Sequence, residues 1–153
     1  MFDNYFDSVR SYLFYRGAEK EKASDLAQDV FLRVWEKQID IDLKKGLPLL
    51  YKIAGDMFVT QYRRETLEVN YRKALEENQY DFSPEEHMRY NELFSGYMKA
   101  LAAMNEKQRT VFLMARMDGL KYHEIAERLH LSIKAVEKRM SVALAFLKKS
   151  LYL

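Results

Sequence analysis

Cysteine is absent from this chain of 153 residues, which also has only two prolines and five glycines. The lack of cysteine excludes disulfides, thiolate metal sites and thiol nucleophiles together. The scattered glycines leave no Gly-rich loop of the kind that binds phosphates. No apolar run approaches the ~20 residues that span a bilayer. Asp3 and Asp7, close to the start, are unlike a signal peptide. We therefore expect a cytoplasmic protein without direct membrane insertion.

Catalytic chemistry has little support among the residues that are present. His123 and Glu124 begin a pattern like that of a zinc-protease helix, but Glu127 stands where the second histidine is required. We expect no enzyme activity, no catalytic residues, no metal ligands, no cofactor and no small-molecule substrate.

Net charge is low for the whole chain, at +2, but it is unevenly distributed. Residues 1–64 carry eleven basic and ten acidic side chains, residues 65–92 carry three and eight, and residues 93–153 carry eleven and five. This division indicates two folded units with different partners. A solvated acidic helix beside an ordinary basic surface would give the same counts, so charge alone leaves both interpretations open.

Apolar residues recur at helical spacing throughout the chain, and no segment alternates as a strand does. The expected helices cover about 2–16, 22–37, 48–64, 84–104, 105–118, 122–130 and 133–151. The same periodicity predicts that Leu93 and Leu144 face the core. We expect an all-α protein of two small helical domains, residues 1–64 and 84–153, joined by an acidic linker over residues 65–83.

Local signals indicate where three of these helices begin. Pro48 suits the first position of a helix, where its missing N–H costs nothing. Ser83 can cap a helix whose first residue is Pro84, and Asn105 with Gln108 has the spacing of a capping box.

Residues 122–136 fit a helix-turn-helix. Two helices that cross at ~90–120° need a small residue on the first helix, a tight turn and an apolar plug on the second, and Ala126, His130 and Val136 supply them. Glycine is usual in such a turn, but His tolerates positive φ better than most residues. Ser132 can cap the second helix, which leaves its first turn free to enter a major groove.

The outward residues of the second helix, with basic residues beside it, are the candidates for DNA contact. Lys134 and Lys138 could meet guanine edges or phosphates, and Glu137 could accept a hydrogen bond from a cytosine amine. Arg109 and Lys121 are better suited to phosphates. The full set is Arg109, Lys121, Ser132, Ile133, Lys134, Glu137, Lys138, Arg139 and Ser141. The alternative is a plain helical hairpin with a basic face.

The most specific stretch of the chain lies between Ser24 and Glu36. A buried stripe explains its branched apolar residues, and it leaves on other faces Asp25, Gln28, Asp29, Leu32 and Trp35. Polar side chains beside an exposed Leu and Trp predict a protein-docking surface. The alternative places Trp35 in the local core and leaves the acids solvated.

Several stretches, in this order, resemble the RNA polymerase sigma factors of bacteria. They are DLAQDVFLRVWE (25–36), LLYKIAGDMFVTQYRR (49–64) and KQRTVFLMARMDGLKYHEIAERLHLSIKAVEKRMSVAL (107–144). The two-domain layout is similar to that of the extracytoplasmic-function (ECF) group. The resemblance implies a factor that binds core RNA polymerase and directs promoter recognition, DNA melting and transcription initiation. It also implies that Asp25, Gln28, Asp29, Leu32 and Trp35 dock on the polymerase, and that the helix-turn-helix reads the minus-thirty-five element.

The resemblance further implies that residues 38–46 and the helix after them capture the unpaired minus-ten element. Basic side chains there could follow phosphates, and aromatic ones could stack on flipped bases. The candidate set is Lys44, Lys45, Lys52, Asp56, Tyr62, Arg63 and Arg64. Tyr51 and Phe58 are either stacking surfaces or core residues. The family commonly has Asn at the position of Asp56 and Arg at that of Gly55, and a carboxylate accepts hydrogen bonds without donating them.

Partners follow from the same resemblance. They are core RNA polymerase, promoter DNA and an anti-sigma factor, while the acidic linker would follow the nucleic-acid path of the polymerase. Two other classes remain as alternatives. One is a helix-turn-helix regulator that binds duplex operators as a dimer. The other is an interaction module that docks on polymerase without reading DNA.

Overall fold

The structure is a computed structural model that describes residues 2–37, 46–61 and 84–151. Within these ranges every element is helical, as expected. The helices are α1 (Phe2–Arg16), α2 (Lys20–Glu36), α3 (Gly46–Gln61), α5 (Pro84–Ala103), α6 (Glu106–Arg116), α7 (Tyr122–Leu129) and α8 (Ile133–Leu151). The proposed linker, residues 65–83, and the cap at Ser83 lie outside the described residues.

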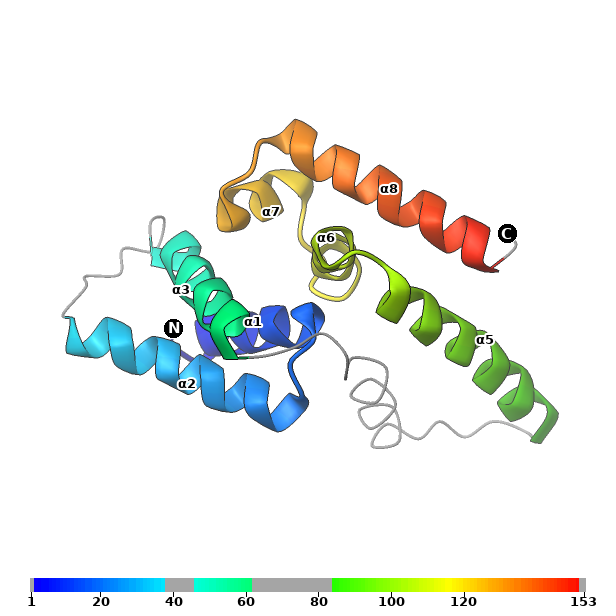
Figure 1. Ribbon diagram of the computed structural model, residues 1–153, viewed down its shortest axis with the longest axis horizontal. Helices are drawn as coiled ribbons and strands as arrows, with labels where there is room; N and C mark the ends of the chain where they lie inside the picture. Colours follow the sequence, from blue (N-terminus) through cyan, green and yellow to red (C-terminus); the bar gives the residue numbers. More distant parts are fainter. Residues whose placement is uncertain (1, 38–45, 62–83, 152–153) are drawn as a thin grey trace.

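The first three helices pack on one another and form the N-terminal unit (Figure 1). Their shared core includes Val9, Leu13, Leu26, Val30 and Leu50, each at most 1% exposed. Helix α1 ends at Gly17, whose φ of 128° is a conformation that side chains with a Cβ rarely adopt. The N–H of Ala18 then donates to the carbonyl of Leu13 at 3.1 Å, which closes the helix end.

Tyr51 and Phe58 belong to this core. They are 1% and 3% exposed, and the Tyr51 ring lies 4.7 Å from the ring of Tyr12 in an edge-on packing. The Tyr51 hydroxyl donates to the carbonyl of Ser8 at 3.3 Å. The stacking interpretation of these two residues is therefore wrong in this structure, and the core interpretation is confirmed.

The C-terminal unit consists of α5 to α8, with α6 packed against α8 and α5 beside it. Asn105 caps α6, because its side chain accepts a hydrogen bond from the N–H of Lys107 at 2.9 Å. The second hydrogen bond of the predicted capping box, from the N–H of Asn105 to the side-chain oxygen of Gln108, does not form. The Oε1 atom of Gln108 is buried without a hydrogen-bond partner among the described residues.

Helix faces and helix starts differ from expectation at three positions. Leu93 is 69% exposed, and among the described side chains of α5, residues 91–103, the buried ones begin at Met98. Leu144 is 49% exposed, because α8 buries Ala143 instead, and one helical position is a rotation of about 100°. Pro48 is the third residue of α3 rather than the first, a displacement that still leaves it within the first turn.

The two units contact each other along an interface that is called the seam below. Residues far apart in the chain form it. Helix α1 packs on α6, and α3 packs on α7, so that the helix-turn-helix lies beside the N-terminal unit (Figure 1).

Candidate polymerase-binding and DNA-binding surfaces

The helix-turn-helix forms as predicted. His130 ends α7 in the left-handed conformation, with φ of 56° and ψ of 43°. Ser132 caps α8, since its Oγ accepts a hydrogen bond from the N–H of Ala135 at 3.1 Å. The plug Val136 is fully buried, and the small residue Ala126 is 5% exposed. The predicted roles of these four residues are confirmed.

The start of α7 is held by a carboxylate. The side chain of Glu124 accepts a hydrogen bond from the N–H of Lys121 at 3.0 Å. This hydrogen bond favours the ionised form and lowers the pKa of Glu124, and the nearby Arg128 lowers it further. The carboxylate also lies in the first turn of the helix, where negative charge is favourable.

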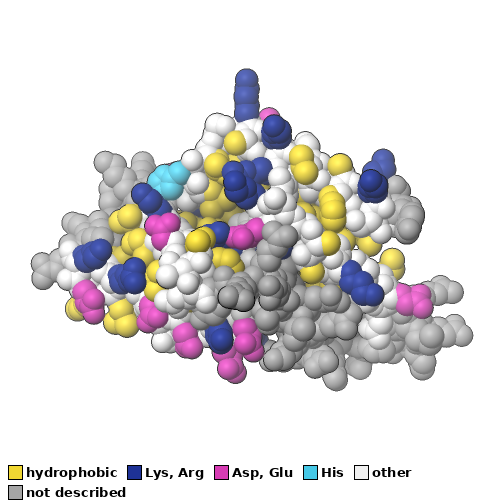
Figure 2. Space-filling view, viewed as in Figure 1, with side chains coloured by type: hydrophobic (Ala, Val, Ile, Leu, Met, Phe, Trp, Pro, Cys, Tyr) yellow, Lys and Arg dark blue, Asp and Glu magenta, His cyan; other side chains and the backbone are white. Residues whose placement is uncertain are grey.

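The predicted reading residues at the start of α8 are open to solvent. Ile133 is 49% exposed. The other exposed members of the predicted set on and before α8 are Ser132, Lys134, Glu137, Lys138 and Ser141, and Lys121 before α7 is exposed as well. Figure 2 shows Lys and Arg side chains spread over the upper part of the molecule, where α7 and α8 lie. The arrangement is that of a helix whose capped first turns can enter a major groove.

Arg139 lies at the edge of this surface. It is half-buried and lines a small cavity of about 190 Å³ together with Arg16 and Glu106. It is therefore shared between the basic surface and the seam.

Arg109 is not a surface residue, so its predicted contact with phosphate is wrong in this structure. It is 0% exposed. Its guanidinium donates to the carbonyls of Tyr15 at 2.9 Å and Arg16 at 2.8 Å, at the end of α1. It also donates to the carbonyls of Leu101 at 3.4 Å and Met104 at 3.2 Å, at the end of α5. A planar cation with five donors suits a cluster of helix-terminal carbonyls, which explains why it is buried.

The predicted polymerase-docking residues share an exposed face of α2. Trp35 is 81% exposed and Leu32 is 56% exposed, while Val30 and Val34 on the opposite face are buried. The polar members Asp25, Gln28 and Asp29 are exposed too. The alternative that placed Trp35 in the local core is therefore wrong. An exposed Trp beside an exposed Leu and acids is a composition typical of protein-binding surfaces.

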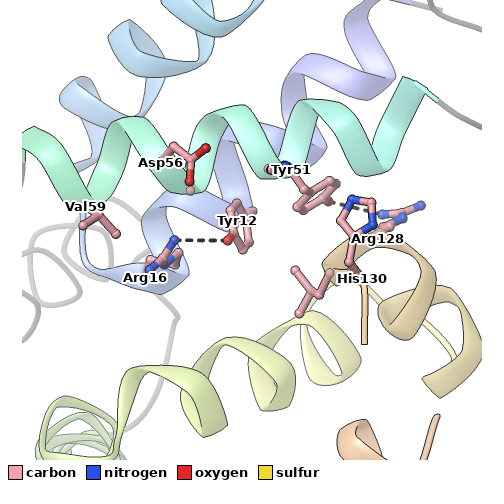
Figure 3. A pocket seen from close by; sticks show the side chains of 10 residues that line it. Tyr12, Arg16, Tyr51, Asp56, Val59, Arg128 and His130 are labelled. Atoms are coloured by element: carbon pink, nitrogen blue, oxygen red, sulfur yellow. Dashed lines mark hydrogen bonds between the residues drawn. The ribbon is translucent and has the colours of Figure 1, made fainter. Parts of the chain in front are cut away.

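The predicted minus-ten residues are only partly described. Lys52 and Asp56 are exposed on α3 and border a cavity of about 480 Å³. Arg128 and His130 of the helix-turn-helix line the same cavity (Figure 3). Lys44, Lys45, Tyr62, Arg63 and Arg64 lie outside the described residues.

The walls of this cavity are joined by hydrogen bonds. Arg128 donates to the Tyr51 hydroxyl at 3.3 Å, and the His130 Nε2 lies 3.3 Å from the carbonyl oxygen of Pro48. Burial raises the pKa of Tyr51 to about 12, although Arg128 acts in the opposite direction. The phenol therefore stays protonated at neutral pH, and its O–H can donate a hydrogen bond to the carbonyl of Ser8.

Gly55 has a steric role in the same region. A Cβ atom there would lie 2.8 Å from Nη1 of Arg16 and 3.1 Å from the hydroxyl of Tyr12. The guanidinium of Arg16 lies 4.9 Å from the centre of the Phe58 ring, and its Nη1 donates to the Tyr12 hydroxyl at 3.2 Å. Glycine at this position lets Arg16 lie across α3.

Sequence reasoning missed the seam residues, above all Tyr15, Arg16, Glu106 and Asp118. Their partners are about ninety or more positions away in the chain, as in the bonds Arg16–Glu106 and Tyr15–Asp118. Neither periodicity nor a local motif marks such pairs.

No group of three or more potential metal ligands occurs among the residues that the structure describes. In those same residues, no helix has both the length and the apolar character needed to cross a bilayer.

Fold and surfaces together define a class of protein. It is an all-α protein with a C-terminal helix-turn-helix whose basic first turns are exposed, and an N-terminal helical unit that exposes a Trp-bearing face of α2.

Comparison with known proteins agrees with this class. Residues 96–147 match the family described as Sigma-70, region 4. The ferric citrate uptake sigma factor FecI of Escherichia coli is 34% identical over 137 residues, which cover 88% of this chain and 79% of the relative. The RNA polymerase sigma factor YlaC of Bacillus subtilis is 27% identical over 99% of this chain and 90% of its own. The sigma factor RpoE of Bartonella quintana, solved in complex with the anti-sigma factor NepR, has the same fold, with a TM-score of 0.63 at 20% identity and coverage of 97% and 92%.

The chain belongs to the bacterial RNA polymerase sigma factors, in the ECF group. Its function is accordingly that of a transcription initiation factor, rather than that of a regulator that binds operators by itself as a dimer.

Proposed function

We propose that the exposed face of α2 docks this sigma factor on core RNA polymerase and that the two helical units read the two promoter elements. In this assignment α8 enters the major groove at the minus-thirty-five element. Helix α3, with residues 38–45 and 62–64 on either side of it, binds the unpaired minus-ten element. The domain bounds 1–64 and 84–153 with the linker 65–83 belong to the same proposal.

The observation that carries the proposal is the division of exposed chemistry between the units. The docking face on α2 offers Leu32, Trp35 and acids, a surface suited to protein. The first turns of α8 offer Lys134 and Lys138, which suit nucleic acid. One molecule can therefore hold the polymerase with one unit and duplex DNA with the other.

Arg109 is no longer part of the minus-thirty-five set, and Arg139 contributes at its edge. Base contacts fall to Lys134, Glu137, Lys138 and Ser141, while Lys121 is placed to contact a phosphate. Asp56 gives the minus-ten surface an acceptor, and a carboxylate there repels phosphate, so we place a base amine rather than the backbone against it.

The proposal extends to partners and place of action. Sigma factor and polymerase meet on chromosomal DNA, so we place the protein in the cytoplasm. A relative of the same fold was solved with an anti-sigma factor, which supports a comparable inhibitor here. We assign no catalytic step to this chain, because promoter recognition needs binding and DNA deformation rather than bond chemistry.

Replacing Trp35 on the docking face tests the assignment of α2. In Trp35→Ala, loss of the most exposed apolar side chain of this face should weaken binding to core polymerase at least about tenfold. The measurement is a titration of labelled sigma factor with core polymerase. The combination of Gln28→Ala and Asp29→Ala should weaken it as well.

A control on the same helix is Glu21→Ala, which changes an exposed residue outside the predicted docking set. Its affinity should stay within about twofold of the unsubstituted chain, because isolated surface charges contribute little. Equal affinities for Trp35→Ala and Glu21→Ala would place the docking surface elsewhere.

A further inference from the structure

We propose that the cavity of about 480 Å³ lined by α1, α3 and α7 is a binding site for a small molecule that carries two phosphate groups. Arg16 and Arg128 each hold one of these groups, and Lys52 adds positive charge beside them. The site rests on the chemistry of the cavity walls and is independent of the assignment of promoter elements.

Positive charge predominates in these walls. The basic side chains that line the cavity are Arg16, Lys52 and Arg128, while Asp56 is the carboxylate among its described lining residues, which leaves an excess of two positive charges. Within the described part of the chain, ion pairs involve Arg10 and Arg16, and neither Lys52 nor Arg128 makes one. A concave surface with an excess of one charge attracts ligands of the opposite charge.

The positive charge continues into the neighbouring cavity of about 190 Å³, which shares Arg16 with the first. This second cavity adds Lys107 and Arg139, and neither makes an ion pair with a described residue. Its carboxylate, Glu106, is already paired with Arg16. The region as a whole therefore favours an anion.

The two arginines lie at opposite ends of the larger cavity, with the side chains of Tyr12 and Tyr51 between them (Figure 3). Nη1 of Arg16 donates to the Tyr12 hydroxyl at 3.2 Å, and Nη1 of Arg128 donates to the Tyr51 hydroxyl at 3.3 Å. These contacts fix the orientation of each guanidinium but engage few of its five N–H donors. Two separated cations of this kind match a ligand with an anionic group at each end, since guanidinium groups bind phosphate through paired hydrogen bonds.

Gly55 gives Arg16 its position in the cavity wall. A Cβ atom at Gly55 would lie 2.8 Å from Nη1 of Arg16. The guanidinium also lies 4.9 Å from the centre of the Phe58 ring, within the range of a cation–π contact. A residue of α1 can therefore reach the cavity across α3 because position 55 has no side chain.

The walls also limit the body of the ligand that joins the two phosphate groups. The volume of the cavity lies within the roughly 300–1,000 Å³ that is usual for small-molecule sites. Tyr12 and Tyr51 are only 7% and 1% exposed, so their rings offer little surface on which an aromatic base could stack. The ligand class is accordingly a compact bisphosphate with a body that is not aromatic, as in a sugar bisphosphate.

One consequence for transcription rests on the proposed function. Lys52 lines this cavity and also belongs to the residues proposed for the minus-ten element. A bound bisphosphate would occupy Lys52 and repel the phosphates of a DNA strand, so ligand and strand compete. The small molecule is thereby an inhibitor of promoter binding.

Titration calorimetry on the free, full-length chain tests the site with fructose 1,6-bisphosphate as the probe. Fructose 6-phosphate, which has one phosphate group, and inorganic phosphate are the comparison ligands. The bisphosphate should bind at least about tenfold more tightly than either, because its second phosphate group gains charged hydrogen bonds of its own. Equal affinities for the bisphosphate and the monophosphate, or no binding of the bisphosphate, would overturn the proposal.

Substitutions that each remove one positive charge locate the bound ligand. Arg128→Gln should weaken binding of fructose 1,6-bisphosphate at least about tenfold, and Lys52→Gln, at an exposed residue, about threefold. The matched control is Arg116→Gln, at an exposed residue at the end of α6 that does not line the cavity. Its affinity should stay within about twofold of the unsubstituted chain. An equal loss in Arg116→Gln and Arg128→Gln would show general attraction of anions and would overturn the site.

Gly55→Ala keeps the test decisive if Arg128→Gln fails to fold. It leaves every charge in place and favours the helix, but its methyl group displaces the end of the Arg16 side chain. The bisphosphate should bind about tenfold more weakly while the helical circular dichroism stays unchanged. Unchanged affinity in folded Gly55→Ala and Arg128→Gln would overturn the proposal.

A single-stranded oligonucleotide in the same titration distinguishes a free bisphosphate from the phosphates of DNA. Binding of the oligonucleotide that depends on Arg128, without binding of the bisphosphate, would assign these cations to DNA and overturn the site. The result is separable from that of the proposed function, since neither polymerase nor promoter is present. A chain that binds the bisphosphate but not core polymerase would keep the site and reject the proposed function, and the opposite pair of results would do the reverse.

Discussion

Arg109 shows how one residue can suit two opposite interpretations. By sequence it is a cation just before a helix-turn-helix, and such a residue commonly meets phosphate. In the structure it is wholly buried and donates to the ends of two helices. The difference arises because the carbonyls that it serves come from Tyr15, Arg16, Leu101 and Met104, and only the fold brings them to one point.

Replacement of Arg109 separates the two interpretations. Arg109→Ala removes the buried guanidinium and its hydrogen bonds to the helix-end carbonyls, so it should lower the free energy of unfolding by about 3 kcal/mol or more. Chemical denaturation followed by circular dichroism measures this. The control Lys121→Ala, at an exposed residue, should change stability by less than about 0.5 kcal/mol. A fully stable Arg109→Ala protein with weaker DNA binding would restore the phosphate interpretation.

Local sequence predicted well those residues whose role depends on their own neighbourhood. His130 adopts the positive φ that the turn demands, and Ser132 caps α8 as its position suggested. Gly17 likewise adopts a positive φ directly after α1. These roles depend on backbone conformation within a few residues, which residue type alone can indicate. Arg16 and Asp118 have roles that depend on distant partners, and no local pattern reveals them.

At the scale of the helices, the predicted order of helices is confirmed, whereas two residues that were predicted to face the core are exposed. All the described helices were expected, with ends displaced by a few residues. Leu93 and Leu144 point outward because burial depends on which neighbour covers a helix and along what part of its length. Amphipathic periodicity shows which face of a helix is apolar, but it does not show which neighbouring element covers that face. The docking face of α2 was predicted correctly as exposed because Leu26, Val30 and Val34 already account for its buried stripe.

Helix α8 gives the element-scale prediction. If Lys134 or Lys138 reads a base, its replacement by Ala should cost ~1–3 kcal/mol at one promoter position and relax the preference there. Binding of holoenzyme to a set of single-base promoter variants measures this. Lys148→Ala, at the far end of the same helix, is the control and should leave every preference unchanged. A loss that is equal for all promoter variants would identify the lysine as a phosphate contact instead.

The whole molecule has a low net charge, but it exposes two surfaces of different composition. The basic surface lies over α7 and α8, and the Trp-bearing face lies on α2 of the other unit (Figure 1), which is why charge counted over the full chain hides them. The seam then couples the units, since α1 is completed by Arg109 of α6 and α3 rests on α7.

The most direct test of the central claim is transcription by a reconstituted holoenzyme. Core RNA polymerase alone, or with this chain added, is incubated with fragmented genomic DNA, and transcript starts are mapped. We predict starts that appear only with the chain, with a shared element about 35 base pairs upstream and another about 10 base pairs upstream, and that Trp35→Ala strongly reduces them. The absence of chain-dependent starts on any genomic promoter, under conditions where the chain is folded, would contradict the account.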